Sequence, residues 1–185
     1  MIPLDPSRGP HLAGAEREAT AWHRGAPAPG TAWWQPWAAL AGFAFLLNFV
    51  WEMGQAPLYR GMATAPHWTA VRICTLATAG DVAILLMAYG LIAAVVRNRR
   101  WLAAPSTGRV AAFIAVGLAA TLGLELLNVY VLGRWAYGAE MPRVFGVGIT
   151  PLLQWIVLPP ATIWLAQRHL GWVPGRLSST VGTHT

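Results

Sequence analysis

The chain of 185 residues contains no lysine, one cysteine and only seven acidic residues. Charged residues make up 11% of it, against about 25% in an ordinary soluble domain. The single cysteine, Cys74, excludes an internal disulfide and a metal site built from cysteines alone. No long block of like charges is present, so the net charge of +6 does not indicate nucleic-acid binding.

Apolar residues, by contrast, make up 56% of the chain. They form four segments of about 20 residues, each long enough to cross a bilayer: 34–55, 73–96, 110–132 and 148–167. We therefore predict an all-α, polytopic membrane protein with four transmembrane helices in a bundle. Pro159 and Pro160 predict a kink in the fourth helix, because proline removes an N–H donor and clashes with the preceding turn.

Segments 1–31 and 171–185 are polar, which predicts disordered tails on either side of a membrane domain at 32–170. If both tails lie on one side of the membrane, nine of the thirteen arginines lie there too. These nine are Arg8, Arg17, Arg24, Arg97, Arg99, Arg100, Arg109, Arg168 and Arg176. The positive-inside rule then predicts that both termini are cytoplasmic. The use of arginine alone, with many alanines and glycines, is typical of GC-rich bacteria, so we expect a bacterial inner (cell) membrane.

Three acidic residues, Glu52, Asp81 and Glu125, lie inside or at the rim of apolar segments. A carboxylate in hydrocarbon costs several kcal/mol, so such residues usually face a shared interior and serve a function. At about 1.5 Å per residue, Asp81 and Glu125 lie about 10 to 12 Å below the outer ends of their helices. The sequence thus predicts a buried acidic pocket in the outer half of the bundle.

Neutral polar and aromatic residues extend this candidate site. Asn48, Glu52 and Gln55 share one helical face at i, i+4 and i+7, and Tyr59 continues roughly the same line. The remaining predicted members are Asn128 one turn from Glu125, Gln154 at similar depth, and Trp51, Trp135 and Tyr137 beside the site. The two outer loops are expected to cover it.

Two further patterns concern packing. Ala115, Ala119 and Gly123 recur at i, i+4 and i+8, which favours close helix contact along that face. Tryptophans, Trp101 among them, fall near the ends of the predicted helices, as expected for aromatic belts at the membrane surface.

Three classes of function fit these residues. Buried protonated carboxyl groups are suited to general acid catalysis. Carboxylates with amide oxygens also suit a hard cation, so a cation-binding or transport protein is an alternative. A non-catalytic membrane accessory subunit is the third, with the polar residues joining helices. The five histidines lie outside the predicted helices, which argues against haem; we expect no cofactor and assign no metal ligands.

A resemblance to a known group of enzymes adds to the first class. The run RWAYGAEMPRVFGVGITPLLQWIVLPP resembles a region of membrane carotenoid hydratases and lycopene cyclases, and NFVWE is similar to a helix of membrane-integral terpene cyclases. The match spans about 40 of the 185 residues. The Pro-x-Glu-Glu signature of the cyclases is absent, because the corresponding stretch, 150–154, reads Thr-Pro-Leu-Leu-Gln.

The resemblance implies protonation, hydration or cyclisation of an isoprenoid or another lipid-like substrate that enters from the membrane. It implies that Glu52 or Asp81 donates the proton and that Glu125 is the partner base. It further implies that Asn48 or Gln154 orients water. The rings implied to stabilise a carbocation are those of Trp51, Trp135 and Tyr137. Assembly into a homo-oligomer is left open.

Overall fold

A computed structural model of the protein describes residues 32–172, so the predicted tail at 1–31 and residues 173–185 lie outside the described part. Four long helices are present in it: α2 (Gln35–Gln55), α3 (His67–Val95), α4 (Thr107–Leu126) and α5 (Ile149–His169). Shorter elements join or extend them: 3-10 helices η1 (Ala56–Leu58) and η2 (Trp101–Ala103), the π-helix η3 (Leu127–Val131), and a hairpin of β1 (Arg143–Val144) and β2 (Val147–Gly148).

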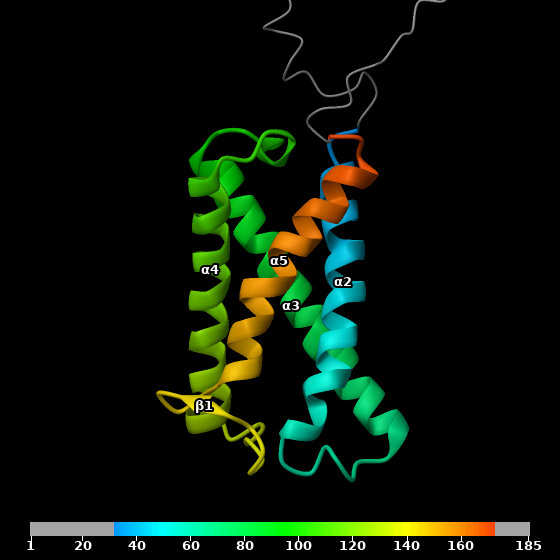
Figure 1. The fold of residues 1–185 in the computed structure, drawn as a ribbon, viewed down its shortest axis with the longest axis vertical. Helices are drawn as coiled ribbons and strands as arrows, with labels where there is room; N and C mark the ends of the chain where they lie inside the picture. The colour runs from blue at the N-terminus through cyan, green and yellow to red at the C-terminus, as the bar shows by residue number, and fades with distance from the viewer. Residues whose placement is uncertain (1–31, 173–185) are drawn as a thin grey trace, which may run out of the picture. The chain divides into compact units, whose positions relative to one another are not determined.

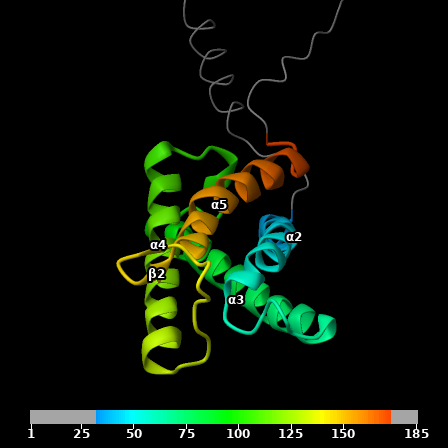
Figure 2. The same ribbon diagram turned by 60° about the horizontal axis from the view of Figure 1, so that its bottom comes forward.

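The four long helices of the described part are long and apolar enough to cross a membrane. Successive helices run in opposite directions, and α5 lies between α2 and α4 in both views (Figures 1 and 2). Both α2 and α4 pack against α3 and α5. The predicted all-α, multi-pass membrane bundle is therefore confirmed. We call the end of the bundle at which α2 ends and α3 begins the loop end, and the opposite end the base.

The helix bounds depart from the prediction at α3 and α4. The α3 helix begins at His67, directly after Pro66, rather than at Ile73, because no helix-breaking residue lies between them. The regular part of α4 ends at Leu126, and the backbone then widens into η3, where Leu132 N donates to Leu127 O at 2.8 Å. A π-turn of this kind is rare and is often found at functional sites.

The α5 helix continues unbroken through Pro159 and Pro160, so the two prolines do not reduce the number of helices. Pro159 is buried in the bundle, where neighbouring helices exclude solvent from the backbone. Helix-breaking residues are tolerated in membrane helices because surrounding groups compensate for the lost hydrogen bond. The kink predicted here stays a prediction.

The apolar core lies toward the base. Its largest fully buried side chains include Leu40, Tyr89, Trp101 and Phe113. The Trp101 ring stacks on Tyr89 with centroids 5.6 Å apart, and its Nε1 donates to Tyr89 O at 3.3 Å. The Tyr89 hydroxyl in turn donates to Arg99 O. The expectation that Trp101 belongs to a lipid-facing belt was wrong, because η2 folds back and inserts the indole between α3 and α4.

The face by which α4 packs also differs from the predicted one. Ala115, Ala119 and Gly123 are exposed. The buried side of α4 carries Gly117 instead, where an added Cβ would lie 1.8 Å from the Trp155 ring. A bulky indole on α5 therefore fills the space that the glycine leaves, a pairing that spacing of small residues alone does not reveal.

This contact predicts a measurable difference between two glycines of one helix. Gly117→Ala should lower the stability of the purified protein in detergent by roughly 1–3 kcal/mol, the usual cost of overpacking, because the buried Trp155 ring must move. Gly123→Ala is the matched control, since nothing lies within 4 Å of its added Cβ. The two thermal unfolding midpoints are compared; equal midpoints would contradict the Gly117–Trp155 packing.

Candidate functional site

Glu52 and Asp81 form a pair of carboxyl groups between α2 and α3. Their carboxyl groups lie close enough to interact electrostatically. A carboxylate has only acceptor atoms, so a direct hydrogen bond between the two carboxyl groups would require that one of them carry a proton. The Cys74 thiol also donates to the backbone oxygen of Glu52, at 3.7 Å, and ties α3 to α2 at this level. The structure thus brings together two of the three acids singled out by the sequence.

Gln154 of α5 connects this pair to the neighbouring amides. Its Nε2 donates to Asp81 Oδ2 and to Asn48 Oδ1, both at 2.8 Å, and its Oε1 accepts from Gln55 Nε2 at 3.3 Å. Both N–H donors and the carbonyl oxygen of this buried amide are therefore in use. The predicted members Asn48, Gln55 and Gln154 lie together as expected, on two helices that meet over the pair.

The remaining contacts of this group run along α2. Gln55 Nε2 donates to Glu52 Oε1 at 2.7 Å, and Trp51 Nε1 donates to Gln55 Oε1 at 3.2 Å. Asn48 Nδ2 donates back to Ala44 O at 2.7 Å. These spacings of three and four residues are those at which side chains of one helix meet. Trp51 therefore reaches the carboxyl pair through Gln55 rather than directly.

Glu125 of α4 has different partners, all aromatic. Tyr137 OH donates to its Oε2 at 2.5 Å, Trp135 Nε1 donates to the same oxygen at 3.5 Å, and Tyr59 OH donates to Oε1 at 3.5 Å. The Tyr59 and Tyr137 rings lie 5.7 Å apart. This carboxyl group therefore faces up to three hydrogen-bond donors, each carried by an aromatic ring.

The phenols around Glu125 respond to this environment. Burial, followed by the charge of Glu125, raises the pKa of Tyr59 above its ordinary value. Burial and the hydrogen bond to Glu125 raise the pKa of Tyr137. The charges of Glu52 and Asp81 contribute to the same rise in the pKa of Tyr59. Both tyrosines therefore keep their protons and act as donors at neutral pH.

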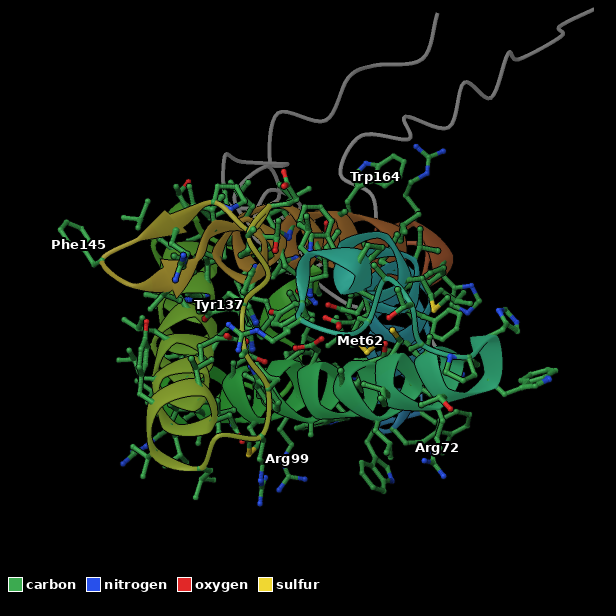
Figure 3. The ribbon with its side chains drawn as sticks, turned by 90° about the horizontal axis from the view of Figure 1, so that it is seen from below. Met62, Arg72, Arg99, Tyr137, Phe145 and Trp164 are labelled. Atoms are coloured by element: carbon green, nitrogen blue, oxygen red, sulfur yellow. The ribbon has the colours of Figure 1, made fainter. Side chains whose placement is uncertain are left out.

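Backbone pairing of the two loops holds these tyrosines in place. Arg60 N donates to Ala136 O at 2.8 Å, and Gly138 N donates to Leu58 O at 2.7 Å, which makes a short antiparallel bridge between Tyr59 and Tyr137. An added Cβ on Gly138 would lie 2.8 Å from Leu58 O, so the approach requires glycine. In the view from the loop end, Tyr137 and Met62 lie over the bundle, whereas Arg72 points away from it (Figure 3).

Asn128 does not join the group, although it is buried as predicted. Its Nδ2 donates to Leu124 O at 2.7 Å, and its Oδ1 accepts from Arg134 NH1 at 3.4 Å. The π-turn of η3 begins at Leu127, so the spacing of three residues from Glu125 no longer places Asn128 on the same face. Asn128 thereby fixes the start of the second loop.

The sequence analysis missed three residues at the site. Gly138 permits the loop pairing described above. Thr78 and Thr121 lie one helical turn before Asp81 and Glu125, and their buried hydroxyls make no hydrogen bond within the described part of the chain. The spacing of three and four residues from an acid was the signal that could have found the threonines. No signal in a single sequence pairs Gly138 with Leu58.

Comparisons with known proteins yield no match: no family model, no curated protein and no solved structure is similar to this chain. Among residues 32–172, no group of three or more histidine, cysteine or acidic side chains is arranged to hold a metal ion. The chemistry of the site therefore has to be inferred from its own geometry.

The carboxyl pair predicts a specific modification. Carbodiimides react with protonated carboxyl groups, so dicyclohexylcarbodiimide at neutral pH should add to Glu52 or Asp81, as mapped by peptide mass spectrometry. The double variant Glu52→Gln, Asp81→Asn should lose this adduct. Glu140, an exposed loop residue, is the internal control and should stay unmodified because its carboxyl group faces water. A wild-type protein without an adduct on either residue would contradict a shared proton.

Tyr137 predicts a pH dependence. A phenol whose pKa is raised by folding adds stability that is complete below the unfolded value of about 10 and is lost as pH rises through the folded value. Wild type and Tyr137→Phe are titrated, and the two phenolate absorbance curves are subtracted. The difference, which reports Tyr137, should therefore develop only above pH about 10. The free energy of unfolding should also fall less steeply at high pH in Tyr137→Phe than in wild type. A difference signal already present below that pH would contradict the contact with Glu125.

Proposed function

We propose that this protein is a membrane-embedded enzyme that performs acid–base chemistry on a lipid-like substrate, with an isoprenoid chain as the substrate class. The observation that carries the proposal is the presence of two kinds of carboxyl group in one bundle. Glu52 and Asp81 lie together and accept from the Gln55 and Gln154 amides, whereas Glu125 is held by Tyr59, Tyr137 and Trp135. Pairs of titratable groups in contrasting environments are typical of acid and base partners.

The proposed reaction begins at the pair. Its protonated member gives a proton to one carbon of an isoprenoid double bond, and the electron pair of that bond forms the new C–H bond. The more substituted carbon becomes cationic, and the charge left on the pair is shared through the hydrogen bonds from Gln154 and Gln55. Hydrogen bonds to a developing carboxylate are charge-assisted and strong, so these amides favour the transfer.

The second half of the reaction takes place near Glu125. The aromatic rings around it offer their π-faces to the cation, with ring-to-cation attraction of about 0.5–2 kcal/mol each. Glu125, as the base, removes a proton from an adjacent carbon and closes the double bond, or accepts the proton of a water that adds to the cation. Glu125 then gives this proton to solvent, and the pair takes up a proton from solvent to complete the cycle.

The cation-binding alternative has less support from the geometry. One oxygen each of Asp81, Asn48 and Glu52 already accepts from an amide N–H group, so a hard cation would have to compete with these contacts. The accessory-subunit alternative predicts the same hydrogen bonds but no turnover. The experiment below separates it from an enzyme.

The test is deuterium incorporation. Membranes containing the protein are incubated with a polyprenyl or carotenoid substrate in deuterated water, and the product is analysed by mass spectrometry. Wild type should add one deuteron per turnover. Asp81→Asn, Glu52→Gln and Glu125→Gln should each lower the rate by about 10²-fold or more, the usual contribution of a general acid or base.

Glu140→Gln is the matched control, because this acidic residue is exposed in the second loop, and it should keep wild-type turnover. Thermal unfolding of each variant is measured in parallel. No deuterium incorporation by a folded wild-type protein on any substrate of this class would contradict the proposal. If the carboxamide variants lost their cooperative unfolding as well, the cluster would be assigned to packing.

A further inference from the structure

The hairpin between the second loop and α5 carries an unusual residue at its tip. Strands β1 and β2 pair Arg143 with Gly148 and Val144 with Val147, so Phe145 and Gly146 form a two-residue turn. Both have positive φ, +50° for Phe145 and +84° for Gly146. Turns of this kind favour asparagine and glycine, and a bulky residue at positive φ is an outlier. Phe145 is nevertheless 100% exposed. No contact within the described part of the chain therefore offsets the cost of its positive φ.

The hairpin is held rigidly at this position. Tyr130 OH, on η3, donates to Gly146 O at 2.5 Å. An added Cβ on Gly146 would lie 2.9 Å from that hydroxyl, so the turn fits closely against the tyrosine. Val147 on the second strand is buried. The exposure of Phe145 is therefore a property of an anchored structure, and not of a loose loop.

The direction of the hairpin identifies what surrounds its tip. In Figure 1 it extends sideways beside the last turns of α4, and in Figure 3 Phe145 projects away from the helices. The end of α4, η3 and the residue after it expose apolar side chains near this tip: Leu126, Leu127, Tyr130, Val131 and Leu132. Apolar side chains exposed at the end of a membrane-spanning helix are covered by lipid. The tip thus extends toward lipid at the level where the helix leaves the membrane.

We infer that the Phe145 hairpin is a lipid-interface anchor, in which the Phe145 ring enters the acyl-chain region while exposed Arg143 remains at the lipid phosphates. An aromatic tip with an adjacent arginine matches the layered chemistry of a bilayer surface, apolar within and anionic above. The hairpin reaches the candidate site through Gly148, the last residue of β2, because an added Cβ there would lie 3.0 Å from the Tyr137 ring. The anchor does not depend on the proposed catalysis.

The test places a probe next to the tip and keeps Phe145 intact. Cys74→Ala removes the native thiol, and Val144→Cys, at a residue 42% exposed, receives an environment-sensitive fluorophore. The protein is reconstituted at one copy per lipid nanodisc, with nitroxide labels on the upper acyl chain. Quenching at residue 144 is expected to exceed by several fold the quenching of the same probe at Ala139, an exposed residue of the second loop.

A second variant isolates the role of the ring. Phe145→Asn, which suits positive φ and so preserves the turn, should reduce the quenching at residue 144 toward that at Ala139. Equal quenching at the two sites, or quenching that the Asn variant leaves unchanged, would overturn the anchor. A probe signal that changes only when two copies share a nanodisc would also overturn it and would assign the tip to contact between copies.

Discussion

The structure depends on the need to satisfy three carboxyl groups inside an apolar bundle. Lipid offers no hydrogen bonds, so each polar group at this depth needs a partner within the protein. The partners found here are amide, phenol and indole donors rather than arginine side chains: Gln154 and Gln55 for the Glu52–Asp81 pair, and Tyr137 for Glu125. A neutral donor does not force a carboxyl group into its ionised form, whereas an ion pair with arginine would favour that form.

The rest of the fold provides a frame for this network. Toward the base, Trp101 and Tyr89 fix the connection between α3 and α4, and Trp155 seats against Gly117 where α4 meets α5. Close packing of this kind gives each helix one position relative to its neighbours. Donors on one helix and acceptors on another can meet at 2.8 Å only in such a frame, as Gln154 and Asp81 do. At the loop end, the pairing of the two loops places Tyr59 and Tyr137, whose hydroxyl groups donate to Glu125.

Much of this arrangement could be predicted from the sequence because hydrophobicity and depth are local properties. Four helices, and the common depth of Asn48, Glu52, Asp81 and Gln154, follow from counting residues at a fixed rise. Which face of a helix turns toward its neighbours is less predictable. The π-turn displaced Asn128 from its expected face, and Gly117 rather than the regular small-residue row packs against α5. Contacts between loops, such as Leu58 with Gly138, depend on the whole fold and have no local signature.

The two loops connect the lipid surface to the carboxyl groups by a short series of contacts. The carbonyl oxygen of Gly146, at the tip of the hairpin, accepts from Tyr130. Gly148, the last residue of β2, packs against Tyr137, and Tyr137 donates to Glu125. The same segment that meets lipid therefore positions the hydroxyl group that holds Glu125, so a displacement of the hairpin at the membrane surface changes the environment of the proposed base.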